Sequence, residues 1–179
     1  MAGFKIRTAK LVDVDMLVEH RHMMFEEMSH PSAESLRIAD DSYRSWASDM
    51  MKRRLLRGYV ATAGNGKAAA SGCVWLREVQ PSPDRPSGMV PYVLSMYTRP
   101  EYRRNGLASK ILTEATEWAR KEGYHKIVLH ASTVGRKVYS QLGWKRTWEM
   151  EFRYDRLSVP AHPVRGRSLR SSRRASAAT

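Results

Sequence analysis

Cysteine is almost absent from this chain of 179 residues, in which Cys73 is the only one. A single cysteine excludes a disulfide framework within the chain, and it excludes a zinc site built from several cysteines. No apolar run approaches the roughly 18 residues that a membrane-spanning helix needs, and the first residues lack the apolar stretch of a secretory signal. These absences predict a cytoplasmic protein that has no membrane partner.

Acidic side chains are scarce beside basic ones: 18 Asp and Glu residues stand against 31 Lys and Arg residues, for a formal net charge of +13. Residues 160–179 contain several arginines but no acid, and they lack the apolar periodicity of a packed segment. We therefore predict one domain over residues 1–159, followed by a basic, flexible C-terminal tail over 160–179. Such a charge favours an anionic partner, either a polyphosphate or a nucleic acid, although a merely solubilising surface explains it equally well.

The spacing of apolar residues predicts an α/β fold of the α+β layer type, with helices on a mainly antiparallel sheet and one late βαβ crossover. Asp13 is expected to cap the first helix. Asp40–Asp41 are candidates to divide the second helix. A Gly-Asn-Gly turn predicts a hairpin. The expected elements are strands at 5–7, 58–63, 69–79, 89–98, 126–130 and within 144–154, and helices at 14–28, 33–56, 107–122 and 133–141.

The most informative stretch is residues 96–109, where a strand ends, a short loop follows and a long helix begins. A helix N-terminus offers unpaired backbone N–H groups and a partial positive charge, so it suits an anion. Gly106 lets the backbone approach a ligand closely, while Arg103, Arg104 and the Ser109 hydroxyl add donors. The stretch predicts a pyrophosphate site, although neither a P-loop nor a GxGxxG motif is present. Taken alone, it fits a solvated loop–helix junction at least as well.

Two motifs together resemble those of the GCN5-related N-acetyltransferase (GNAT) superfamily. Residues 103–108, Arg-Arg-Asn-Gly-Leu-Ala, match the family's [Q/R]-x-x-G-x-[G/A] pyrophosphate loop. Residues 139–144, Tyr-Ser-Gln-Leu-Gly-Trp, look like its Y-x-x-x-G-[F/W] element. The resemblance covers residues 4–155. It implies a GNAT-like mixed sheet flanked by helices, with acetyl-CoA bound at the late crossover.

The resemblance also implies which residues contact acetyl-CoA. Backbone groups of one strand end would pair with the pantetheine arm where two central strands separate, and backbone amides of the loop would hold the pyrophosphate. Ser132 stands where many members carry an asparagine that contacts the cofactor. The residues assigned to acetyl-CoA in this way are Met96, Tyr97, Thr98, Arg103, Arg104, Asn105, Gly106, Leu107, Ala108, Ser109 and Ser132.

Tyr139 falls on the position of the family's usual general acid, which protonates the thiolate of coenzyme A as it leaves. A phenol with an ordinary pKa near ~10 is protonated at neutral pH and can donate this proton. The alternative role for Tyr139 is structural, as an aromatic ring packed beneath Leu142 and Trp144.

The general base has no counterpart at the family's usual place, because residues 89–98 include no carboxylate. Glu26 and Glu27 are candidates, since the family's first two helices usually wall the acceptor site; solvated surface carboxylates are the alternative. Arg21 falls on the apolar face of the first helix, where burial would demand a partner, so we predict that it binds an acidic group of the substrate.

These observations favour an N-acetyltransferase that passes the acetyl group of acetyl-CoA to a primary amine in a ternary complex. Cys73 has no evident basic partner, which disfavours an acyl-cysteine route. A small-molecule amine is the expected acceptor, no metal is expected, and the family's habit of dimerising allows a homodimer. Two alternatives stay open: a nucleic-acid or ribosome-associated protein that binds through its basic tail, and an acetyltransferase that acts on an RNA-borne or protein amine.

Overall fold

The computed structural model describes residues 3–83, 85–133 and 135–151, and every structural statement below refers to them. Contacts divide the chain into two units, with the boundary after Lys145. The helices and strands described here all lie in the first unit. Residues 146–151, the described part of the second unit, contain neither helix nor strand.

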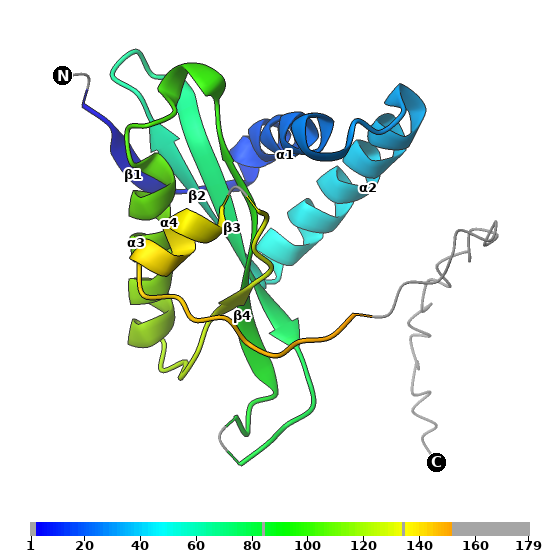
Figure 1. Ribbon diagram of the computed structural model, residues 1–179. Coiled ribbons are helices and arrows are strands. Elements are labelled where there is room, and N and C mark those ends of the chain that lie inside the picture. Colours follow the sequence, from blue (N-terminus) through cyan, green and yellow to red (C-terminus); the bar gives the residue numbers. More distant parts are fainter. Residues whose placement is uncertain (1–2, 84, 134, 152–179) are drawn as a thin grey trace, which may run out of the picture. The chain divides into compact units, whose positions relative to one another are not determined.

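A five-stranded sheet forms the centre of the first unit (Figure 1). The strands lie side by side in chain order, and each neighbouring pair is antiparallel except the last, β4–β5, which is parallel. The parallel pair requires a crossover, which α3 provides. The strands are β1 (Lys5–Thr8), β2 (Leu56–Thr62), β3 (Ala68–Glu78), β4 (Met89–Thr98) and β5 (Val128–Leu129).

Helices cover both faces of this sheet, because neighbouring residues of a strand point to opposite faces. In β2, Tyr59 and Ala61 pack in the core beneath α3 (Leu107–Lys121) and α4 (Arg136–Gln141). Val60, between them, packs in the core beneath α1 (Val14–Ser29) and α2 (Ala33–Lys52). Short 3-10 turns, η1 (Leu11–Asp13) and η2 (Pro100–Tyr102), precede α1 and α3. The result is a three-layer arrangement.

The predicted fold class is confirmed, with a mainly antiparallel sheet and one parallel crossover. Two local predictions are wrong. Asp40–Asp41 do not divide the second helix, because α2 runs unbroken through them. Asp13 holds the N-cap position of α1, but its carboxylate does not cap the helix. It accepts instead from the Lys10 backbone N–H and from Arg7.

The end of the chain departs furthest from the prediction. β5 has two residues where five were expected, and α4 begins at Arg136, three residues later than predicted. The strand predicted within 144–154 is wrong over its described part, since residues 144–151 adopt no strand. The predicted domain boundary at 159–160 and the basic tail lie outside the described residues.

Membrane spans and metal clusters are both missing from the described part of the chain. No helix there is long and apolar enough to cross a bilayer. No group of three or more histidine, cysteine, aspartate or glutamate side chains is arranged to hold a metal ion there.

Candidate active site

The two parallel strands β4 and β5 separate within the sheet. They pair at only two positions, Tyr92 with Val128 and Val93 with Leu129. β4 continues for five residues beyond Val93, and on its other side it remains paired with β3 as far as Thr98. The second half of β4 therefore presents an edge that no described strand covers. Such an edge offers backbone N–H and C=O groups to an extended ligand.

A β-bulge lies in this uncovered half of β4. The β3–β4 register shifts between Ser71 and Cys73, and Ser95 has a left-handed backbone with a φ of 53°. The Met96 side chain lies over Gly72 at this bulge, where a side chain at position 72 would overlap with the Met96 Sδ atom. A bulge redirects a strand and re-aims its backbone groups. The lone glycine inside a strand was the sequence signal for this feature.

The loop after β4 folds back sharply before α3. Arg104 and Gly106 both adopt left-handed backbone conformations, with φ values of 63° and 70°. Asn105 lies between them, and its side-chain amide donates to the carbonyl oxygens of Tyr102 and Arg103, each at 3.1 Å. Alternation of this kind produces concave backbone surfaces that attract anions.

α3 begins directly after this loop with its N-terminus open. The N-cap residue, Gly106, supplies no side chain to pair with the first N–H groups, which belong to Leu107, Ala108 and Ser109. A Cβ atom built on Gly106 would meet nothing within 4 Å among the described residues. Free donors, a positive helix end and open space are the features that a diphosphate requires.

Arg103 and Glu27 meet beside this loop. The Arg103 Nη2 atom lies 2.7 and 2.6 Å from the two carboxylate oxygens of Glu27, and Nε donates to the Thr98 carbonyl oxygen at 3.0 Å. The Tyr97 hydroxyl also donates to Glu27, at 2.9 Å. Hydrogen bonding from Arg103 above all, and then from Tyr97, lowers the pKa of Glu27. A carboxylate held in this way is a weaker base than a free one.

His20 forms a buried polar network that the sequence analysis missed. Its side chain is fully buried, and Arg99 Nε donates to Nε2 at 3.1 Å. Since a guanidinium can only donate, Nε2 is the acceptor and Nδ1 carries the proton that is shared with the Ser71 hydroxyl at 2.9 Å. Arg99 also pairs with Glu19 at 2.7 Å. Burial above all, and then the Arg99 charge, lowers the pKa of His20 to about 4.

Arg99 and Arg103 thus attach the loop before α3 to two carboxylates of α1, Glu19 and Glu27. These attachments position the start of α3 against the end of β4. Sequence spacing carries no signal for them, because they join side chains more than seventy positions apart.

The remaining acceptor-site candidates, Arg21 and Glu26, have different surroundings on α1. The Arg21 guanidinium lies 4.6 Å from the ring centroids of both Phe25 and Tyr43. Its Nη1 atom is buried and has no hydrogen-bond partner among the described residues, and burial lowers its pKa. Glu26 instead lines a hollow of about 360 Å³ between α1 and α2, near His22. The structure does not bring Glu26 to Arg103.

Tyr139 lies in α4, half-buried against the core beneath α3, with its ring centroid 6.1 Å from that of Trp144. Burial raises the pKa of Tyr139, so its hydroxyl stays protonated at neutral pH. The Ser132 hydroxyl accepts from the Gly135 N–H at 3.1 Å and so helps to start α4. Gly135 leaves room for the Tyr139 ring, because a Cβ atom there would lie 2.8 Å from a ring carbon and the ring would have to shift.

Known acetyltransferases share the fold of this chain. The model of the acetyltransferase (GNAT) family matches residues 18–144. A GCN5-related N-acetyltransferase from Ralstonia eutropha is 27% identical, with a TM-score of 0.76 over 85% of this chain and 99% of that one. A predicted acetyltransferase from Clostridium acetobutylicum, solved with acetyl-CoA, is 26% identical, with a TM-score of 0.75 over 85% of this chain and 96% of that one.

Glucosamine-6-phosphate N-acetyltransferase from Arabidopsis thaliana is 17% identical, with a TM-score of 0.64 over 85% of this chain and 98% of that one, which shows a likeness of fold alone. A comparison with curated proteins gave no match. The fold, with its separated parallel strands and open helix end, is that of a GNAT acetyltransferase. The family match covers more than half of the chain, which therefore belongs to the GNAT family.

Proposed function

We propose that this enzyme transfers the acetyl group of acetyl-CoA to a primary amine within a ternary complex. One observation supports this proposal more strongly than any other. β4 and β5 part after Val93 and Leu129, and the uncovered edge of β4 leads straight into the loop that opens α3. Acetyl-CoA joins a pantetheine arm, whose amide groups can pair with the strand edge, to a diphosphate, which suits the loop and the helix N-terminus. The two parts of the molecule follow one another in the same order as these two features of the protein.

The backbone does most of the binding in this proposal. The edge of β4 from Met96 to Thr98 pairs with the amide groups of the pantetheine arm. The N–H groups of residues 104–109 surround the pyrophosphate, and the helix end adds favourable charge worth about 0.3–1 kcal/mol at an exposed site. Gly106 keeps this space open, and the fit is supported by the finding that a Cβ atom built on Gly106 meets nothing within 4 Å among the described residues.

Acetyl-CoA supplies a thioester, whose acyl carbon accepts the amine. The new N–C bond forms as the C–S bond breaks, and the Tyr139 hydroxyl donates its proton to the departing sulfur. A backbone N–H at the β4 bulge stabilises the negative charge on the carbonyl oxygen. Because the pKa of Tyr139 is raised, its hydroxyl remains protonated at neutral pH and can donate to the departing thiolate.

Direct transfer is supported by the state of the lone cysteine. Cys73 is fully buried, and desolvation raises the pKa of its thiol to about 12. A buried, protonated thiol is a poor nucleophile. The acetyl group therefore passes to the amine without an acyl-cysteine stage.

The attacking nitrogen is neutral, so an ammonium acceptor first loses one proton to water. As the N–C bond forms, this nitrogen loses a second proton to water, and the Tyr139 oxygen regains its proton from solvent. Glu27 has a lowered pKa and is held by Arg103, so we assign it a positioning role instead of the role of base. Arg21 and Glu26 remain the proposed contacts to a small-molecule acceptor. A cytoplasmic location and a homodimer remain predictions.

Initial-rate kinetics of thiol release test this function. Acetyl-CoA and a panel of small primary amines should give intersecting reciprocal plots, as a ternary complex requires. Parallel plots would contradict direct transfer.

The identity of the acceptor is tested with two further substrates, a peptide with a free N-terminus and an aminoacyl-tRNA. Deletion of residues 160–179 should leave turnover of small amines intact; a selective loss of turnover with the tRNA substrate would favour the RNA-borne alternative.

A further inference from the structure

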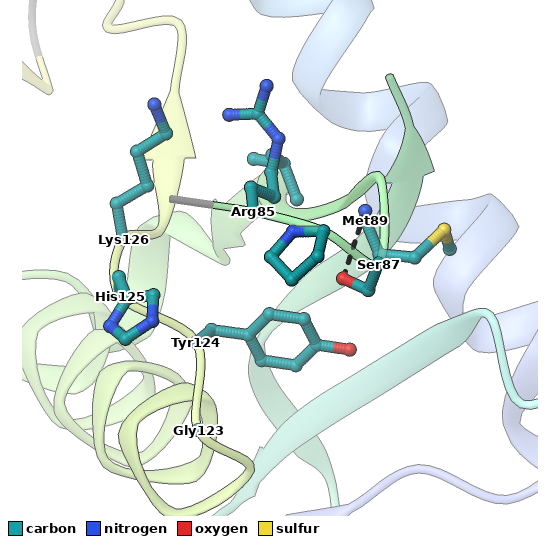
Figure 2. Close-up of a pocket in the computed structure, with 9 residues that line it drawn as sticks. Arg85, Ser87, Met89, Gly123, Tyr124, His125 and Lys126 are labelled. Carbon is teal, nitrogen blue, oxygen red and sulfur yellow. Dashed lines mark hydrogen bonds between the residues drawn. The ribbon is translucent and has the colours of Figure 1, made fainter. Parts of the chain in front are cut away.

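The acceptor amine must reach the β4 bulge, where the acyl carbon of acetyl-CoA is proposed to lie. The hollow at the start of β4 is too far away to hold this amine (Figure 2). Val90 lines that hollow, and the bulge at Ser95 lies five residues further along the strand. At about 3.3 Å per strand residue, the separation is roughly 16 Å. The groups that select the acceptor are therefore those around the bulge itself.

Tyr43 of α2 connects this bulge to Arg21 of α1. The Tyr43 hydroxyl lies 3.9 Å from the Cys73 Sγ atom and interacts with the Ser95 side chain. The central carbon of the Arg21 guanidinium lies 4.6 Å from the centroid of the same ring. Leu94, next to Ser95, packs against the core beneath α1 and α2. Arg21 therefore lies on the face of the sheet that these two helices cover, one tyrosine side chain from the bulge.

Arg21 differs from the other arginines that contact α1. Arg44, Arg99 and Arg103 each pair with a carboxylate of this helix, at 2.9, 2.7 and 2.6 Å. Arg21 forms no salt bridge and no hydrogen bond through its side chain within the part of the chain that the structure describes. A half-buried cation without a partner is costly, so a bound anion would be stabilised beside it.

One edge of the Arg21 guanidinium is open to a ligand. The rings of Phe25 and Tyr43 contact the group, and its Nη1 atom is enclosed. The Nε and Nη2 atoms are not enclosed, and neither has a hydrogen-bond partner among the described residues. Their N–H bonds point the same way from one edge of the planar group, which is the geometry that accepts both oxygens of a carboxylate. The enclosed Nη1 atom takes no part in this contact.

The charge around Arg21 favours an anion with a single charge. Asp40 acts on Arg21 through space, but its carboxylate is already hydrogen-bonded to His22 at 2.6 Å. A carboxylate would balance the one positive charge of Arg21. A phosphate with two negative charges would leave one of them unbalanced near Asp40, in partly buried surroundings where such a charge is costly.

We propose that the acceptor is an amine that also carries a carboxylate, such as an amino acid. Arg21 binds the carboxylate through its Nε and Nη2 edge, while the amine faces the acyl carbon at the β4 bulge. This inference rests on the proposed function and narrows its acceptor from any primary amine to an amino carboxylate. Arg21 is thereby the residue that determines specificity for the acceptor.

Calorimetric titration into the full chain, with CoA present, tests the carboxylate contact apart from turnover. Glycine, β-alanine and 4-aminobutyrate vary the distance between amine and carboxylate, and each is compared with its carboxamide. For at least one length, the acid should bind about tenfold more tightly than the amide, or better. Equal binding of acid and amide at every length, or no saturable binding of any acid by the folded chain, would overturn the proposal. Tighter binding of 2-aminoethyl phosphate than of the best acid would overturn the choice of a carboxylate.

Variants locate this contact. Arg21→Gln should bring the ratio of acid to amide affinity to about one, and it should leave CoA binding unchanged, because the amide does not use the charge. Arg53→Gln, which removes an exposed charge at the end of α2, is the matched control and should keep the wild-type ratio. Arg21→Lys retains the charge without the paired N–H bonds, so its ratio should be intermediate, and it serves if Arg21→Gln does not fold. A wild-type ratio in folded Arg21→Gln or Arg21→Lys would contradict the assignment.

Turnover with acetyl-CoA separates this inference from the proposed function. The acid that binds best should also be acetylated with a higher kcat/KM than its amide, mainly through a lower KM. Equal kcat/KM values for acid and amide would overturn the carboxylate specificity while acetyl transfer itself stands. An acid that binds through Arg21 but is not acetylated would support the carboxylate contact and contradict the proposed function.

Discussion

Arg103 Nη2 lies within 2.7 Å of both carboxylate oxygens of Glu27 and so joins α1 to the loop that begins α3. The pair neutralises one positive charge beside the proposed pyrophosphate site. It also sets the loop's position before any ligand arrives. Both side chains are almost half exposed, so the pair contributes little to stability, and its main effect falls on the binding of an anion.

Glu27→Gln should tighten acetyl-CoA binding about two- to fivefold at low salt, because it frees the Arg103 charge and removes a nearby negative one. Glu26→Gln, one residue earlier and without contact to Arg103, is the matched control and should leave the dissociation constant unchanged. Calorimetric titration measures both. Weaker binding in Glu27→Gln would contradict this electrostatic effect and would show that the pair acts mainly by positioning the loop. If turnover instead fell by about two orders of magnitude at unchanged affinity, Glu27 would be the base after all.

Tyr139→Phe should slow turnover about 100-fold while the dissociation constant for acetyl-CoA stays the same, since the hydroxyl acts only when the sulfur departs. Because burial raises the pKa of Tyr139, wild-type turnover should show no alkaline fall from this group below about pH 10. Tyr124→Phe, at the far end of the sheet, should retain full activity. Retention of more than half the wild-type turnover by Tyr139→Phe would exclude Tyr139 as the acid.

His20 should make the fold sensitive to acid. Its pKa is about 4 in the folded chain against an ordinary value of 6.5, so between these values the unfolded chain binds a proton that the folded chain does not. Stability contributed by neutral His20 is therefore complete above pH 6.5 and is lost as the pH falls toward 4, by about 3 kcal/mol in all.

Denaturant unfolding at a series of pH values measures this loss. His20→Gln should be less stable at pH 7 but should show a flatter pH dependence between 6.5 and 4. His125→Gln, which changes an exposed histidine, should reproduce the wild-type slope. An unchanged slope in His20→Gln would show that another group is responsible.

Gly72→Ala should disturb the β4 bulge, because the new methyl group would displace the partly buried Met96 side chain and would lie 3.2 Å from the Cγ2 atom of the fully buried Ile111. We expect a loss of about 1–3 kcal/mol in the free energy of unfolding. Adding Met96→Ala should recover part of this loss, so the double variant should be more stable than the sum of the single effects predicts. Gly64→Ala, whose methyl group would approach only the Gly3 carbonyl oxygen at 3.9 Å, is the control. Strict additivity would rule out the steric account.

Local sequence predicted most of the fold. The strand at residues 89–98 and the helix beginning at Leu107 lie where apolar periodicity and the Gly106 signal place them. Wrong predictions arose where side chains compete locally. Asp13 prefers Arg7 to the helix N-terminus, and residues 144–151 have the composition of a strand but form none.

The candidate site was predictable only in its backbone. The motif located the loop and the open helix end, because the conformation of both depends on residues that are close together in the sequence. The His20 network and the Arg103–Glu27 pair depend on the packing of α1 against β4 and the loop that follows it, which periodicity does not report. Gly72 was the sequence signal for the β4 bulge, since a glycine inside a strand often marks a bulge or the close approach of another group to the backbone.

The most direct test of the central claim is a calorimetric titration of acetyl-CoA into wild type, Gly106→Glu and Gly123→Glu. Both glycines have left-handed backbones and open space around a built Cβ atom, but Gly106 precedes α3 and Gly123 follows it. We predict saturable binding by the wild type and by Gly123→Glu, and none by Gly106→Glu, whose carboxylate would occupy and repel the pyrophosphate position. Equal binding by both variants, or no binding by a folded wild type, would contradict the proposed acetyl-CoA site.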